Sequence, residues 1–134
     1  MNKALALERQ SDFDEALACY EKSQQGWTFC VEHLNMFWVM PDLLQTLRYR
    51  LMTLLQLQLW PTAAGEIMRF RALFIDYIER EGIDEGLKEA VRNEMVDMIS
   101  ELRTLSSEQR ELLYGELGAD GESVRSLIDK AEGS

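Results

Sequence analysis

Cys30 and His33 are the residues of this chain whose types and spacing come nearest to a catalytic pair. They stand three positions apart, which places them on one face of a helix. In that arrangement an imidazole would take the thiol proton and leave a thiolate nucleophile. Their neighbours are apolar, however, and burial among apolar side chains makes a thiol unreactive. We therefore interpret Cys30 as a packed core thiol and predict no enzyme activity.

The rest of the sequence lacks the motifs of the common catalytic and metal sites. His33 is the only histidine, so sites with two histidine ligands are excluded. The glycines form no phosphate-binding loop, and no serine nucleophile elbow occurs. We predict no catalytic residue, no metal site and no cofactor.

Cysteine use and hydropathy indicate the compartment. Cys19 and Cys30 form no CxxC pair, which favours reduced thiols in a cytoplasmic protein. The first ten residues hold no apolar stretch of signal-peptide length. The longest apolar run covers residues 36–40, which is too short for a membrane span. We expect a cytoplasmic protein without a transmembrane helix.

Residues 26–60 form an apolar segment within an acidic chain. The segment holds all three tryptophans and only four charged residues. Such a segment is either the buried centre of the fold or a surface that a partner covers, and we favour the centre, with one side left for a partner. The predicted partner-binding residues are Trp38, Leu44, Leu47, Arg48, Arg50, Leu51, Leu55 and Trp60.

Four arginines lie in or just after the apolar segment. Arg48 and Arg50 lie within it, and Arg69 and Arg71 follow it closely. Two interpretations remain open for them. They pair with acidic side chains of the later helices, or they anchor an acidic part of a partner and set its orientation.

The formal net charge of −10 is concentrated after residue 60, where 17 acidic residues stand against nine basic ones. Nucleic acids are attracted by Lys and Arg clusters, so this charge disfavours direct binding of DNA or RNA. An acidic surface would instead fit a basic site on a nucleic-acid-binding protein. The acidic face predicted for that alternative comprises Glu85, Glu89, Asp97, Glu101, Glu108 and Glu111.

Apolar residues recur at spacings of three and four throughout the chain, which predicts helices and no strands. Gly26 is expected to stop a helix, Pro41 to end or kink one, and Ser106 with Gln109 to form a capping box. The expected helices are a short one ending near residue 10, followed by 11–25, 27–40, 42–60, 63–81, 85–105, 106–117 and 122–131.

The segment from Ala4 to Gln25 resembles part of a tetratricopeptide repeat. The family places small and aromatic packing residues at the positions of Ala4, Phe13, Ala16 and Tyr20, and Ser23 stands where a small residue is usual. The first helix is truncated, and no second copy appears at the 34-residue period of the family. The resemblance implies a helical hairpin in the first 25 residues.

These observations predict an all-α, single-domain bundle of about five to seven helices over residues 1–134. Its parts are the N-terminal hairpin (1–25), the apolar central helices (26–60), acidic amphipathic helices (61–131) and a frayed tail (132–134). The predicted function is a non-enzymatic, chaperone-like or regulatory adaptor that binds an amphipathic segment of a client protein. We also expect a homo-oligomer, in the form of a dimer. The alternative is the acidic inhibitor of a nucleic-acid-binding protein.

Overall fold

The computed structural model describes residues 2–132, and side chains are described for residues 12–130. Within that range the chain forms six α-helices, two short 3-10 helices and no strand, which confirms the predicted all-α bundle. The elements are α1 (Asn2–Leu34), η1 (Phe37–Val39), α2 (Met40–Gln56), α3 (Trp60–Glu79), α4 (Glu85–Arg103), α5 (Ser107–Leu117), η2 (Gly118–Asp120) and α6 (Gly121–Glu132).

The N-terminal third differs from the prediction, because α1 is one continuous helix of 33 residues. The predicted helix ends near residue 10 and at Gly26 are therefore wrong, and so is the tetratricopeptide-like hairpin. A single glycine costs a helix only about 1 kcal/mol, which packing along a neighbouring helix offsets. That packing comes from Leu17, Trp27 and Val31, which are partly buried against the core. The helix ends at Leu34, before Asn35 adopts a φ of 53°.

The two prolines begin helices rather than end them. Pro41 lies in the first turn of α2, and Pro61 lies in the first turn of α3. Proline suits this position because the first amides of a helix have no intrahelical acceptor. α2 consequently ends at Gln56, and the turn after it contains Gln58 with a φ of 58°. The predicted helix 42–60 thus ends four residues too late, and Trp60 belongs to α3.

The predicted bounds are close to the observed ones after residue 84. The Asp84 side chain caps α4 by accepting a hydrogen bond from the Leu87 amide at 3.3 Å. The capping box of Ser106 and Gln109 at the start of α5 is confirmed, with both hydrogen bonds at 3.1 Å. α5 ends at Leu117, where the predicted helix 106–117 ends, and Gly118 follows it with a φ of 61°. Of the predicted frayed tail, residue 132 ends α6, and residues 133–134 lie outside the described residues.

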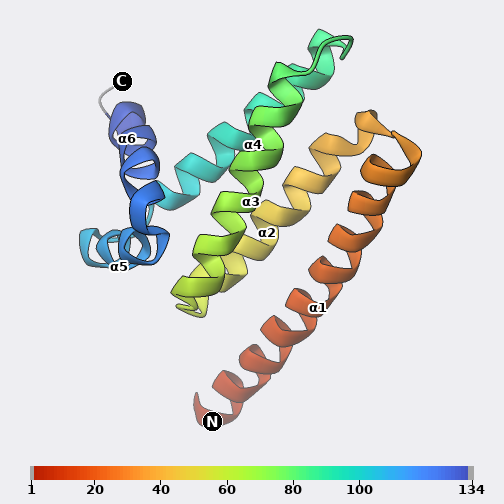
Figure 1. Ribbon diagram of the computed structural model, residues 1–134. Helices are drawn as coiled ribbons and strands as arrows, with labels where there is room; N and C mark the ends of the chain where they lie inside the picture. Colours follow the sequence, from red (N-terminus) through yellow and green to blue (C-terminus); the bar gives the residue numbers. More distant parts are fainter. Residues whose placement is uncertain (1, 133–134) are drawn as a thin grey trace.

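The core centres on α2, which packs between α1 on one side and α3 and α4 on the other (Figure 1). Its buried leucines meet Ile67 and Phe70 of α3 and Val91 and Met98 of α4 in one cluster. The Tyr77 hydroxyl closes one end of the core by donating a hydrogen bond to the Phe37 carbonyl oxygen at 3.0 Å.

The opposite edges of the molecule are formed by α1 and by the pair α5 and α6 (Figure 1). Among the described side chains of α1, only Gln24 is fully buried. α1 is therefore a peripheral helix, whereas α6 contributes Val124 and Ile128 to the core. No helix within the described part of the chain has the length and apolar character that crossing a bilayer requires.

Candidate functional site

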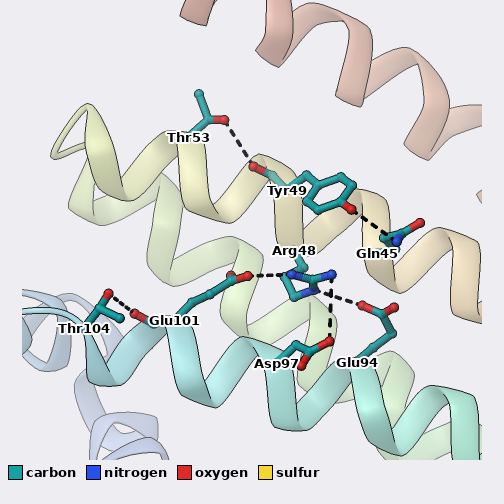
Figure 2. A network of polar contacts seen from close by, with 8 residues as sticks. All are labelled: Gln45, Arg48, Tyr49, Thr53, Glu94, Asp97, Glu101 and Thr104. Carbon is teal, nitrogen blue, oxygen red and sulfur yellow. Dashed lines mark hydrogen bonds and ion pairs between the residues drawn. The ribbon is translucent and has the colours of Figure 1, made fainter.

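Arg48 joins α2 to α4 through a cluster of carboxylates (Figure 2). Its Nε donates a hydrogen bond to Glu94 Oε2 at 2.9 Å, and its Nη1 donates one to Glu101 Oε1 at 2.6 Å. Asp97 completes the cluster at 4.0 Å from Nη2. For Arg48, this geometry confirms the interpretation that the arginine pairs with acidic side chains of a later helix.

Burial shifts the pKa values of the charged groups in this cluster. It raises the pKa of Glu101, and the hydrogen bond from Arg48 lowers that pKa only in part. Burial would lower the pKa of Arg48, but the hydrogen bonds to Glu101 and Glu94 raise it overall. The guanidinium therefore stays charged, and removing it would leave two largely buried carboxylates without a counter-charge. The cluster is a structural connection between helices.

The four leucines predicted as partner anchors are core residues. Leu44, Leu47, Leu51 and Leu55 are all at least 93% buried within this one chain. Their spacing places them on the side of α2 that meets α3 and α4, so a partner cannot reach them in the folded protein. The prediction that they contact a partner is wrong for that reason, and the prediction of a buried centre is correct for them.

The two predicted tryptophan anchors differ from each other. Trp38 is 59% exposed in η1, at the corner between α1 and α2, where Leu34 is 54% exposed. Trp60 packs partly buried against the core at the start of α3. Trp38 is consequently the predicted apolar anchor that remains open to a partner.

A polar cavity of about 450 Å³ lies between α1, α2 and α3. Arg50 donates a hydrogen bond to Glu66 Oε1 there, so its charge is used within the chain. The Gln24 carboxamide and the Thr28 hydroxyl lie against the Arg69 guanidinium. Burial raises the pKa of Glu66, and the charges of Arg50 and Arg69 lower it only in part. The predicted role of Arg50 in orienting a partner has no support in this geometry.

An apolar groove of about 520 Å³ lies between α3, α4 and α6. Both α3 and α6 pack against α4, which contributes Met95 to the groove. Phe74 and Ile75 of α3 and Leu127 of α6 add apolar surface. The remaining lining residues are Ser123, Ser126, Arg71 and Lys130. The groove therefore combines an apolar interior with one basic residue from each of two helices.

The predicted acidic face is divided among internal ion pairs. Asp97 and Glu101 belong to the Arg48 cluster. Arg92 bridges Glu85 at 2.8 Å and Glu89 at 3.1 Å, and Arg125 pairs with Glu111 at 3.0 Å. Glu108, the sixth member, is exposed in the first turn of α5. Five of the six acids are thus offset by arginines of this chain, which weakens their combined field.

Cys30 and His33 do not form a buried pair. Cys30 is partly buried on α1, whereas His33 is exposed and its ring lies 4.9 Å from the Phe29 ring. Within the described residues, no three potential metal ligands come together.

The sequence did not single out most of the residues that line the cavity and the groove. Phe74, Met95 and Leu127 fall within the predicted helices 63–81, 85–105 and 122–131. Their spacing is the same as that of core residues, so periodicity alone does not distinguish them. A signal was present for Arg69 and Arg71, which were noted as basic residues close to the apolar segment and which line the cavity and the groove.

No protein-family model matches this chain, and the curated proteins and solved structures compared with it include no match. The cavity and the groove, with the charged residues that line them, are the features of this structure that bear on function.

Proposed function

We propose that this protein is a non-enzymatic adaptor whose groove between α3, α4 and α6 binds an amphipathic helix of another protein. The observation that carries the proposal is the groove's lining, with Phe74, Ile75, Met95 and Leu127 as apolar contacts. Helices commonly bind in such grooves through apolar residues on one face. Methionine also adapts its shape to different partners, which suits a chaperone-like role.

Charge defines the partner's chemistry. Arg71 and Lys130 come from α3 and α6, the two helices on either side of the groove, in a chain whose formal net charge is −10. A helix that presents acidic residues beside its apolar face would match Arg71. We therefore infer a client helix with an apolar stripe flanked by Glu or Asp.

A labelled synthetic peptide tests this proposal. The peptide is an amphipathic helix of about 18 residues, or five turns, with leucines on one face and glutamates beside them. We expect Ile75→Glu to weaken its binding roughly tenfold or more in fluorescence anisotropy, because the charge enters the groove. Val96→Glu is the matched control, since Val96 is exposed on α4 but does not line the groove.

The peptide's own charges supply the second arm of the test. Replacing its glutamates by lysines should weaken binding, because Arg71 would then face like charges. The proposal is wrong if Ile75→Glu and Val96→Glu weaken binding equally, or if the lysine peptide binds as tightly as the glutamate peptide.

We also propose that the protein forms dimers in the cytoplasm, with a second copy covering the Trp38 corner. Trp38 and Leu34 are both more than half exposed there, and such apolar side chains are favoured at interface centres. The free thiols of Cys19 and Cys30 are compatible with a reducing compartment. Sedimentation equilibrium should show a dimer for the wild type and a monomer for Trp38→Ala. A monomeric wild type would contradict the dimer.

The acidic inhibitor remains the alternative function. The internal pairing of Glu85, Glu89, Asp97, Glu101 and Glu111 makes it the less favoured of the two.

A further inference from the structure

We propose that the polar cavity between α1, α2 and α3 binds a small zwitterion of the α-amino acid class, with its carboxylate on Arg69 and its ammonium group on Glu21 or Glu32. This site is separate from the apolar groove, because the two share no lining residue. It therefore does not depend on the proposed adaptor function.

The cavity has the size and the polar interior of a small-molecule site. Its volume of about 450 Å³ falls within the range of roughly 300–1,000 Å³ that is usual for such sites. Two polar residues of its lining, Gln24 and Glu66, are 5% and 6% exposed. Burying polar groups this deeply is costly unless they form hydrogen bonds or ion pairs, either within the chain or with a ligand.

Arg69 is the group that fits a carboxylate. Its partners on α1 are neutral, namely the Thr28 hydroxyl at 3.3 Å and the Gln24 carboxamide. Arg50, the other arginine of the cavity, is already matched by the Glu66 carboxylate. Arg69 is exposed and lines the cavity, so its planar guanidinium is available for a charge-assisted hydrogen bond to a ligand.

Glu21 and Glu32 are the groups that fit an ammonium ion. Both line the cavity and are exposed, and no ion pair links either of them to another described residue. Arg69 contacts α1 at Gln24 and Thr28, between these two glutamates in sequence. At 1.5 Å per residue, each glutamate lies roughly 4.5–6 Å along the helix axis from the nearer contact. Arg69 of α3 thus contacts α1 between two carboxylates, at a spacing that a compact zwitterion spans.

Phe29 supplies a surface for the ligand's side chain. It lines the same cavity, is 54% exposed and packs at 4.9 Å from the His33 ring, measured between ring centroids. An apolar or aromatic side chain would cover the exposed part of the Phe29 ring. L-Phenylalanine is therefore the first probe, and glycine is the probe for the two charges alone.

Isothermal titration calorimetry of the whole chain with three related compounds tests the carboxylate contact and the ammonium contact separately. L-Phenylalanine carries both charges, 3-phenylpropanoate carries only the carboxylate and 2-phenylethylamine carries only the ammonium group. We expect each single-charge compound to bind at least about tenfold more weakly than L-phenylalanine, since each loses one charged contact. The proposal is overturned if either single-charge compound binds as tightly, or if neither L-phenylalanine nor glycine binds.

Substitutions then assign each charge. Arg69→Gln should reduce binding of L-phenylalanine and of 3-phenylpropanoate but leave binding of 2-phenylethylamine unchanged. The double variant Glu21→Gln, Glu32→Gln should reduce binding of 2-phenylethylamine but leave binding of 3-phenylpropanoate unchanged. Glu108→Gln on α5 is the matched control for loss of a carboxylate. Equal effects of the double variant and Glu108→Gln would overturn the proposal. Because Glu21 and Glu32 are exposed, the double variant keeps the test valid even if Arg69→Gln loosens α1.

Discussion

At the scale of single residues, the buried charges of this protein have partners on other helices. Arg48 has a side chain only 12% exposed and lies against Glu94 and Glu101, which are 15% and 17% exposed. Taking such groups out of water is costly, and their mutual attraction offsets that cost only while both signs are present. The Arg48 cluster therefore holds α2 and α4 together only as a complete set.

Arg48→Met should destabilise the protein by about 3–5 kcal/mol, because Glu94 and Glu101 would be left buried without a counter-charge. The loss is measured as the change in the free energy of unfolding in urea. Arg92→Met is the control, since Arg92 pairs with the exposed Glu85 and Glu89 and its loss should cost less. Equal losses for the two variants would contradict a structural role that depends on burial.

Glu66 should make stability depend on pH in a defined direction. Burial raises its pKa in the folded chain, despite the opposing charges of Arg50 and Arg69. The folded chain therefore holds this proton more tightly, so the contribution of Glu66 to stability is greatest below its unfolded pKa of about 4.3 and declines as pH rises.

Glu66→Gln removes that titration and keeps a carboxamide oxygen that can accept a hydrogen bond from Arg50. Relative to the wild type, the variant should gain stability as pH rises from about 4 to about 7. Urea unfolding at both pH values measures this difference, with Glu108→Gln as the control. A difference that stays constant, or that moves the other way with pH, would show that the raised pKa is wrong.

At the scale of elements, α1 shows that packing overrides weak local signals. Gly26 lies inside the helix, and a Cβ added there would meet nothing within 4 Å. Gly118 differs, because its φ of 61° is one that residues with a Cβ rarely adopt. Glycine is thus not required at position 26, inside the helix, but is favoured at position 118, where the backbone turns after α5.

Gly26→Ala should stabilise the protein by about 0.5–1 kcal/mol, since alanine loses less conformational entropy in a helix and meets no neighbour. Thermal unfolding followed by circular dichroism measures the change. Gly118→Ala should instead be destabilising, by about 1 kcal/mol or more. If Gly26→Ala proves destabilising, α1 does not continue through residue 26.

The boundaries of the later helices were predictable because their signals are local. The Ser106 and Gln109 capping box needs only the four residues it spans, and Gly118 needs only its own backbone freedom. Pro41 was predicted to end or kink a helix but lies in the first turn of α2, because proline both ends one helix and suits the start of the next. Choosing between these roles requires knowing where the chain turns, which depends on packing.

At the scale of the whole molecule, net charge distinguishes the two proposed functions. The chain carries −10, so it repels an acidic client helix at long range while Arg71 attracts it locally. Apolar contacts in the groove would remain at high ionic strength, whereas an acidic decoy would depend on long-range attraction to a basic protein.

Binding of the glutamate peptide should therefore change by less than about threefold between roughly 0.1 M and 1 M salt, where the Debye length falls from about 10 Å to 3 Å. Anisotropy titrations across that range provide the measurement, and a lysine-rich peptide of equal length reports on the acidic alternative. A steep loss of glutamate-peptide binding with salt would contradict a groove dominated by apolar contacts.

The sequence alone determined the helical class of this protein, the later helix boundaries and the apolar character of residues 26–60. These features depend on residue type and on neighbours within about four positions, so they are visible without knowing which helices meet. It did not determine which apolar residues face the core. Leu51 and Trp38 come from the same apolar segment, yet one is 1% exposed and the other 59% exposed.

Only the tertiary structure decided that difference, the pairing of Arg48 with α4, and the positions of the groove and the cavity. Each of these involves residues from two or more helices that are far apart in the chain. The groove combines Phe74, Met95 and Leu127 from α3, α4 and α6, and the cavity combines Glu21, Arg50 and Arg69 from α1, α2 and α3. Periodicity identifies the faces that each helix can bury, but the meeting of the helices decides which faces are buried and which charges are left for a ligand.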